Sequence, residues 1–253
     1  MHALIRTART TGLFYLGLAI SGVLGFVVIR SRLFAADDPA ATLAHLVDNQ
    51  SLARAGVALE LLIVLTQALA AIWFLRLFRS AAPVAAASIA AFGIVNAVAI
   101  LGSAAVLVTA LDVALAPGAD AATVQLLYLA SDSLWGVGGL FFGLWLMPMG
   151  VCVLRSGLMP RLLGWILIVG GVGYILSAFV TYVTPAVGDV VADALVIPAT
   201  VGEFWMIGYL LILGVRPGAL STVPPAPAPA TPAAAGHAVD GGAGSGDTMV
   251  GRR

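Results

Sequence analysis

Three acidic side chains interrupt long apolar stretches of the sequence, and they are the residues best suited to chemistry. They are Glu60, Asp132 and Glu203. Carboxyl groups that meet in an apolar environment can bind a cation, hold and pass a proton, or act together as an acid–base pair. The elements around them must bring the three groups together before any of these activities is available.

The inventory of other reactive side chains is short. All three histidines, His2, His45 and His237, lie outside the apolar stretches, so we expect neither paired haem ligands nor a histidine-based zinc site within them. Cys152 is the single cysteine, which argues against a disulfide framework and a cysteine-based metal site. The sequence also lacks H-E-x-x-H, G-x-S-x-G and Walker motifs. We therefore expect no metal, no cofactor and no recognisable catalytic residue.

The composition is that of a membrane protein. Hydrophobic residues make up 61% of the 253 residues and charged residues only 9%, too few to cover the surface of a water-soluble domain. The formal net charge is zero, which gives no reason to expect a nucleic-acid partner. The apolar residues fall in blocks of roughly 20, about the length that a helix needs to cross the hydrocarbon core. The partner that this composition requires is the lipid bilayer.

The blocks predict an all-α fold, a polytopic bundle of six transmembrane helices. The predicted spans are about residues 11–29, 55–75, 84–111, 124–154, 162–183 and 194–215, within one transmembrane domain of residues 1–216. Residues 217–253 are rich in Pro, Ala and Gly. Because this segment offers little apolar surface to bury, we expect a disordered cytoplasmic tail.

The arginines are distributed unevenly between the two sides of the membrane, and lysine is absent. Seven lie on one side, in segments without acidic residues: Arg6, Arg9, Arg76, Arg79, Arg155, Arg161 and Arg216. The other side carries Arg30, Arg32 and Arg54 among several aspartates. The positive-inside rule then puts both termini in the cytoplasm. The lysine-free, Ala- and Gly-rich composition is typical of a high-GC bacterial genome, so the bacterial plasma membrane is the expected location of this multi-pass protein.

Local signals add detail at the helix ends. Asp38 followed by Pro39 predicts the start of a short interfacial helix between the first two spans. Ser51 is a candidate N-cap for the second span. Pro198 is expected in the early turns of the sixth span, where a missing backbone donor costs least.

The three carboxylates all fall in the outer half of the bilayer on this topology. A charge at the bilayer centre costs at least ~2.5–3.5 kcal/mol, so we expect these groups to face the bundle interior and to share partners there. Arg54, at the outer mouth of the second span, is the nearest cation. It lies roughly 120° from Glu60 around the same helix, so its pairing would be interhelical.

We therefore predict a ligand or proton site formed by Glu60, Asp132, Glu203 and Arg54. The alternatives are a purely structural set of hydrogen bonds across helices and simple exposure to headgroups or water. Proximity in three dimensions decides among them.

Small residues recur at about four-residue spacing on several predicted helices, and such faces let helices approach closely. They are Gly17, Ser21 and Gly25, then Gly139 and Gly143, then Gly170, Gly171 and Gly173. We expect these faces to pack within the monomer. The alternative is a contact face for a homo-oligomer or for a membrane partner.

Several segments carry a resemblance to a known family. They read RTARTTGLFYL, SLARAGVALELL, SDSLWGVGGLFFGLWLMPMGVCVLRSGLMPRLLGWILIVGGVGYIL and PATVGEFWMIGYLLILG. In these segments the chain resembles the bacterial six-helix membrane protein family known as domain of unknown function 4386 (DUF4386), over about Arg6 to Val215. The matching residues include Arg54, Glu60, Asp132, Tyr174, Pro198 and Glu203. The resemblance implies a fold and a membrane location, but the family has no assigned activity and so implies no catalytic residues.

The leading functional interpretation is a non-enzymatic membrane protein that binds or passes a small solute or a proton through the acidic cluster. One alternative is a structural or regulatory membrane partner subunit. Another is an intramembrane enzyme that uses Asp132 and Glu203 as an acid–base pair. A cavity beside the carboxyl groups would favour the first interpretation, whereas a filled, dry bundle would favour the second.

Overall fold

The computed structural model describes residues 2–184 and 188–216, and within these ranges helices joined by short connections are present and strands are absent. Six helical segments are long and apolar enough to cross a bilayer, as predicted. The first is composite, and consists of α1 (His2–Gly22), η1 (Val23–Arg30) and α2 (Ser31–Leu33). The others are α4 (Gln50–Phe78), α5 (Pro83–Leu115), α6 (Ala121–Ser156), α7 (Arg161–Val183) and α8 (Gly188–Ile212). The predicted tail, residues 217–253, lies outside the described residues.

The helices extend beyond the predicted spans at most ends. The spans were predicted from the apolar stretches alone, which do not include the more polar first and last turns of each helix. The last span is the exception, because it was predicted to reach Val215 but α8 ends at Ile212. Gly214 there adopts a left-handed φ of 74°, and its N–H bonds to the carbonyl of Tyr209 at 2.9 Å. This is a common way for a glycine to end a helix.

Two helix N-termini on the side opposite to the chain termini, those of α3 and α6, are capped by aspartates. The predicted interfacial helix is present as α3 (Pro39–Asp48), and Asp38 Oδ1 accepts the backbone N–H of Ala41 at 2.9 Å. Asp120 caps α6 by accepting the Thr123 hydroxyl at 2.6 Å and the Thr123 N–H at 3.0 Å. These hydrogen bonds lower the pKa of Asp120, so the cap stays ionised to more acidic pH.

Two of the local predictions were wrong. Ser51 does not cap α4, because the helix begins one residue earlier, at Gln50, after Asn49. Pro198 is not in the early turns of its span, because α8 begins at Gly188 and holds this proline in its interior. It lies next to Ala199, which contacts Gly170 of α7.

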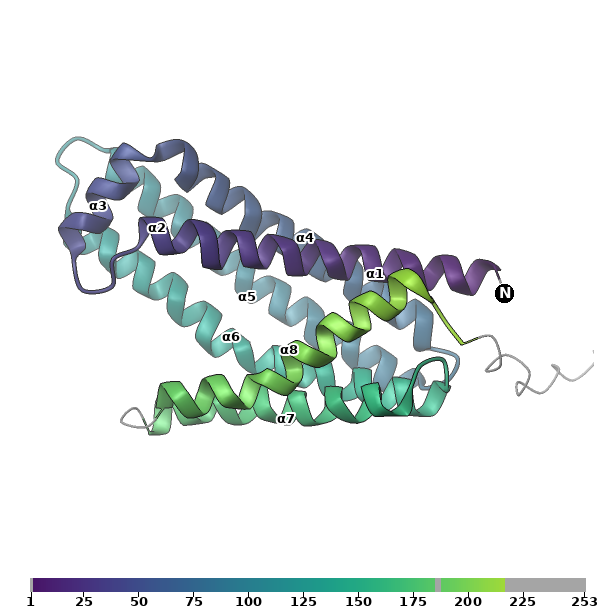
Figure 1. Cartoon of the computed structure of the whole chain (residues 1–253). Coiled ribbons are helices and arrows are strands. Elements are labelled where there is room, and N and C mark those ends of the chain that lie inside the picture. The colour runs from purple at the N-terminus through teal and green to yellow at the C-terminus, as the bar shows by residue number, and fades with distance from the viewer. Residues whose placement is uncertain (1, 185–187, 217–253) are drawn as a thin grey trace, which may run out of the picture. The chain divides into compact units, whose positions relative to one another are not determined.

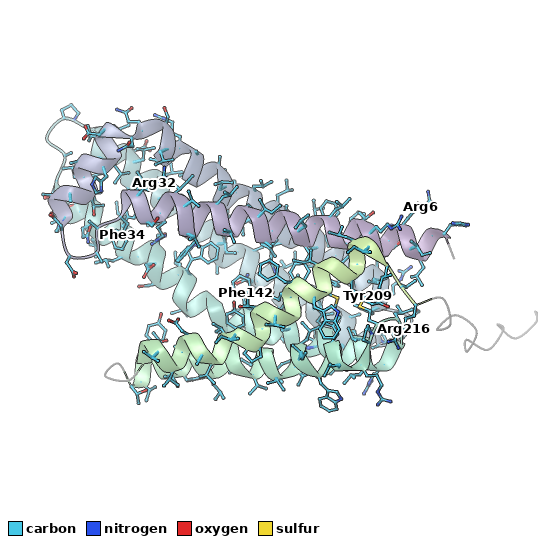
Figure 2. The ribbon with its side chains drawn as sticks, viewed as in Figure 1. Arg6, Arg32, Phe34, Phe142, Tyr209 and Arg216 are labelled. Carbon is cyan, nitrogen blue, oxygen red and sulfur yellow. The ribbon has the colours of Figure 1, made fainter. Side chains whose placement is uncertain are left out.

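The six long helices pack against one another in chain order, and the last of them packs against the first. Each of α4, α5, α6, α7 and α8 packs against its predecessor among the long helices, and α8 also packs against α1. Figure 1 shows α8 beside the N-terminal half of α1, from which it diverges toward the α7–α8 connection. In Figure 2, Arg6 and Arg216 lie at one end of the bundle, and Arg32 and Phe34 lie at the other.

An aromatic cluster fills the region where α1, α4 and α6 meet. Tyr15, Phe74 and Trp145 are all nearly inaccessible to solvent. Their rings meet edge to face, with centroids 5.5 Å apart for Tyr15–Phe74, 5.8 Å for Tyr15–Trp145 and 5.6 Å for Phe74–Trp145. Edge-to-face contacts of this kind add to the energy of burial. The cluster fixes the ring of Tyr15, which matters for the site below.

Most of the small-residue positions pack inside the monomer, as expected, but Gly139 does not, because a Cβ atom there would have nothing within 4 Å. A Cβ atom at Gly143 on α6 would lie 2.6 Å from the carbonyl oxygen of Gly171 on α7. On the other side of α7, a Cβ at Gly170 would lie 2.5 Å from the backbone of Ala199 on α8, and Gly173 meets the carbonyl of Leu195. Backbone thus lies directly on backbone along α6, α7 and α8.

Replacement of Gly143 by alanine should destabilise the bundle. The added methyl group meets backbone that cannot rotate away, and such overpacking costs about 1–3 kcal/mol. Gly139→Ala is the matched control, since it lies one turn earlier on α6 with nothing within 4 Å of the added Cβ. Alanine is a better helix former than glycine, so the control should be neutral or stabilising. Thermal unfolding in detergent measures both, and equal melting temperatures would contradict the close contact.

The predicted orientation has its own test. Fluorescent-protein fusions, which mature only in the cytoplasm, should fluoresce when joined after Arg79, Arg161 or Arg216. Fusions after Asp48 or Asp120 should stay dark, because the arginine-poor side is exported. A reversed pattern would show that both termini lie outside.

Candidate functional site

Arg30 is buried at the end of the first membrane helix and has an unusually complete set of partners. Its side chain is only 9% exposed. One guanidinium nitrogen, Nη2, lies 3.2 Å from Asp132 Oδ1 and donates to the carbonyl of Tyr128 at 3.1 Å. The other, Nη1, donates to the hydroxyl of Ser131 at 3.1 Å. Three residues of α6, Tyr128, Ser131 and Asp132, therefore hold one cation.

Aromatic rings surround the same guanidinium. Its central carbon lies 5.2 Å from the ring centroid of Phe26, 5.6 Å from that of Phe34 and 5.8 Å from that of Tyr128. Cations are attracted to the faces of aromatic rings at such distances, most strongly where water is excluded. Hydrogen bonds and aromatic contacts together replace the hydration that Arg30 has lost.

The π-helix η1 explains why Arg30 faces inward. Ser21, on α1, and Arg30 are both buried, although nine residues separate them. In an α-helix nine residues make two and a half turns, so the two side chains would point in opposite directions. The wider π-helix, with its i→i+5 hydrogen bonds, holds ~4.4 residues per turn, and nine residues then make about two turns. The change in helix type turns Arg30 to the interior.

Glu60 joins the same network from α4. Its Oε1 accepts the Ser103 hydroxyl of α5 at 3.2 Å and the indole N–H of Trp135 of α6 at 3.0 Å. Ser103 in turn lies 2.7 Å from Ser131, which links Glu60 to the ligands of Arg30. The other carboxylate oxygen, Oε2, is buried without a protein partner among the described residues. Glu60 and Arg30 both border a cavity of about 30 Å³.

Glu203 lies in a different setting, on α8. Its Oε1 accepts the hydroxyl of Tyr15 at 2.5 Å. In the parts of the chain that the structure describes, this carboxyl forms no ion pair. The aromatic cluster around Tyr15 holds the donor in place, so the carboxyl has a fixed position although it is not fully buried.

Two adjoining cavities lie between α1, α6, α7 and α8, and together they form the cleft. The inner cavity, of about 230 Å³, is bordered by Tyr15 and Glu203. The outer cavity, of about 650 Å³, is bordered by Asp132 and Asp193 and extends toward the α7–α8 connection. The two share four lining residues, Gly22, Trp135, Phe142 and Tyr174. Figure 2 shows Phe142 where α1 and α8 separate.

Trp135 connects the buried network with the cleft. The indole N–H is bonded to Glu60, while the residue lines both cavities of the cleft. Its ring stacks on that of Phe142, with centroids 6.5 Å apart. Trp135 is thus bonded to Glu60 and lines the inner cavity that Glu203 borders; these two are the only glutamates of the chain.

The four predicted site residues have different positions. Asp132 and Glu60 are linked through Arg30, Ser131 and Ser103, whereas Glu203 borders the cleft on the other side of Trp135. Arg54 is exposed on α4 and forms no ion pair with any described residue. Its predicted place beside the carboxylates is taken by Arg30.

Sequence reasoning missed Arg30 because it was counted among the polar residues of a connection. A signal was present in the spacing, since Phe26 and Phe34 lie four residues before and after it. A second signal was the regular interval of Asp132, Trp135, Gly139 and Phe142, which places them on one side of α6. All four line the cleft.

A family model for a domain of unknown function, DUF4386, matches residues 10–214. The chain belongs to the DUF4386 family. No curated protein and no solved structure matches the chain. The matched region contains the Arg30 network and the whole lining of the cleft.

Removal of the Arg30 charge should destabilise this DUF4386 protein. Arg30→Gln leaves Asp132 without its cation, and breaking a buried pair costs about 3–5 kcal/mol. Asp132 is 52% exposed, so we expect a smaller loss, on the order of 2–3 kcal/mol. Arg32→Gln, two residues away on an exposed side chain, is the control and should change little. Unfolding in detergent distinguishes them, and equal losses would refute a special role of Arg30.

Proposed function

We propose that this protein resides in the bacterial plasma membrane and binds a small, largely apolar solute in the cleft, with the Glu203 carboxyl as its polar anchor. The observation that carries the proposal is a cavity that ends at an ionisable side chain. Most of the residues around that carboxyl are apolar, among them Leu18, Ile63 and Ile207. An apolar pocket with a few fixed polar groups is the usual form of a small-molecule site.

The cleft favours solute binding over a purely structural role for the carboxylates. A structural set of hydrogen bonds would fill the space between α1 and α8, whereas the inner and outer cavities leave it open. The Glu60 network does have the character of a structural element, because Glu60 is 5% exposed and bonded to two helices. We therefore assign the solute to Glu203 and the anchoring of the bundle to Glu60 and Arg30.

The enzymatic alternative has less support. It requires Asp132 and Glu203 to act as a pair, with one of them free to take up a proton. Asp132 is instead bound to Arg30, and Glu203 is bound to Tyr15. The same contacts suit a site that binds and releases a solute without changing it.

The proposal predicts that the cleft is accessible to water from outside the cell. In spheroplasts, Thr200→Cys should react with a membrane-impermeant methanethiosulfonate reagent, because Thr200 lines the inner cavity. Val201→Cys is the matched control, since the neighbouring side chain is 52% exposed and is not part of the cleft lining. A thiol in hydrocarbon does not ionise and should stay unmodified.

Two further samples complete the experiment. Cys152 is buried, so the unmodified protein provides the blank. Ala36→Cys, on the exposed connection before α3, should be labelled and shows that the reagent reaches the outer side. If Ala36→Cys reacts and Thr200→Cys does not, the cleft is closed to solutes and the proposal fails.

A further inference from the structure

We propose that the solute is an organic cation, an ammonium group carried on an alkyl or aryl body. This inference rests on the proposed function of the cleft and specifies its ligand class. The structural basis is a cleft that combines three carboxylates with a stack of aromatic rings.

The charged side chains that line the cleft are all acidic. Asp132 and Asp193 border the outer cavity and Glu203 borders the inner one. Neither cavity has arginine or histidine among its described lining residues. Arg30 neutralises Asp132 from outside the cleft, which leaves Asp193 and Glu203 to attract a ligand. In surroundings of low dielectric constant such charges act over longer distances than in water.

Aromatic rings form the passage between the two cavities. Trp135, Phe142 and Tyr174 line both of them. Each ring is nearly parallel to the next. The planes of Trp135 and Phe142 form an angle of 16° with centroids 6.5 Å apart, and those of Phe142 and Tyr174 an angle of 25° with centroids 5.9 Å apart. Aromatic side chains that line a site are the usual means by which proteins recognise quaternary ammonium groups. A cation that moves from the outer cavity to Glu203 passes these rings.

The same surroundings suit a metal ion or an anion poorly. Calcium takes ~6–8 oxygen ligands, and magnesium requires a near-ideal octahedron. Within residues 2–184 and 188–216, no group of three His, Cys, Asp or Glu side chains could hold a metal. An anion would meet carboxylates at both ends of the cleft. An ammonium group with an apolar body matches the carboxylates, the rings and the aliphatic lining together.

The experiment uses three molecules of the same shape and different charge. Choline is a cation, and neohexanol is the neutral molecule in which carbon replaces the nitrogen of choline. The third molecule, tert-butylacetate, is the carboxylate of tert-butylacetic acid and is therefore an anion. The full-length protein with Thr200→Cys is reconstituted in phosphatidylglycerol vesicles. Each molecule is tested for protection of the thiol against methyl methanethiosulfonate, which is uncharged. Choline should protect at a concentration about tenfold or more below that of neohexanol, and tert-butylacetate should not protect.

Variants then identify the groups that recognise the charge. Glu203→Gln keeps an acceptor for Tyr15 but removes the charge, so choline should lose its advantage over neohexanol. Tyr174→Leu should weaken protection by choline roughly three- to tenfold, whereas Tyr174→Phe keeps the aromatic face and the affinity. Melting temperatures show whether each variant is folded. If Glu203→Gln does not fold, the comparison of the three molecules and of the two Tyr174 variants still decides.

Each outcome has one meaning. Equal protection by choline and neohexanol would overturn the inference, and so would protection by tert-butylacetate. If the thiol of Thr200→Cys reacts equally fast with and without each of the three molecules, the cleft is open to solutes but the proposed ligand class is refuted. Absence of any reaction would refute the proposed function itself. Vesicles that also contain phosphatidylethanolamine test the source of the ammonium group, because a lipid headgroup in the cleft would compete with choline.

Discussion

The structure depends on the burial of one guanidinium group. A cation at the end of an apolar helix can leave water only if the protein replaces its hydration, and for Arg30 that replacement comes from three α6 residues and from aromatic rings. Through Ser131 and Ser103 the same bonds reach Glu60. Polar contacts thereby join the first four membrane helices, and lipid tails offer the groups in these contacts no alternative partner. Their arrangement around Arg30 is consequently specific, whereas contacts between aliphatic side chains alone would allow many alternatives.

The helices α7 and α8 are held by a different principle. They attach to the rest through glycines that bring backbones into contact, along α6 for α7 and along α7 for α8. The polar contacts of this part are few, and the hydrogen bond from Tyr15 to Glu203 is the long-range one that joins α8 to α1. A firmly connected four-helix part and a closely packed helical hairpin thus border the cleft from opposite sides. Ligand sites often form between the helices of a bundle.

The sequence was sufficient for the helices and insufficient for the site, and particular residues show why. The six spans follow from the length of the apolar blocks, because a helix that crosses lipid has few alternatives. Asp38 could be recognised because an N-cap depends on neighbours within one turn. The inward turn of Arg30 depends on the π-helix, and Glu203 finds its donor 188 residues away at Tyr15. Contacts of that separation leave no local pattern, so the acidic residues could be named but their partners could not.

Trp135 has a practical consequence through its position between Glu60 and the cleft. The fluorescence emission of an indole depends on its hydrogen bond and on the polarity beside its ring. For Trp135 the hydrogen bond is to Glu60, and the cleft determines the polarity beside the ring. A molecule that fills either cavity of the cleft lies beside Trp135 as well as Phe142, because both residues line both cavities. Trp135, one of five tryptophans in the chain, thus contributes a component of the intrinsic fluorescence that follows the contents of the cleft without an attached dye.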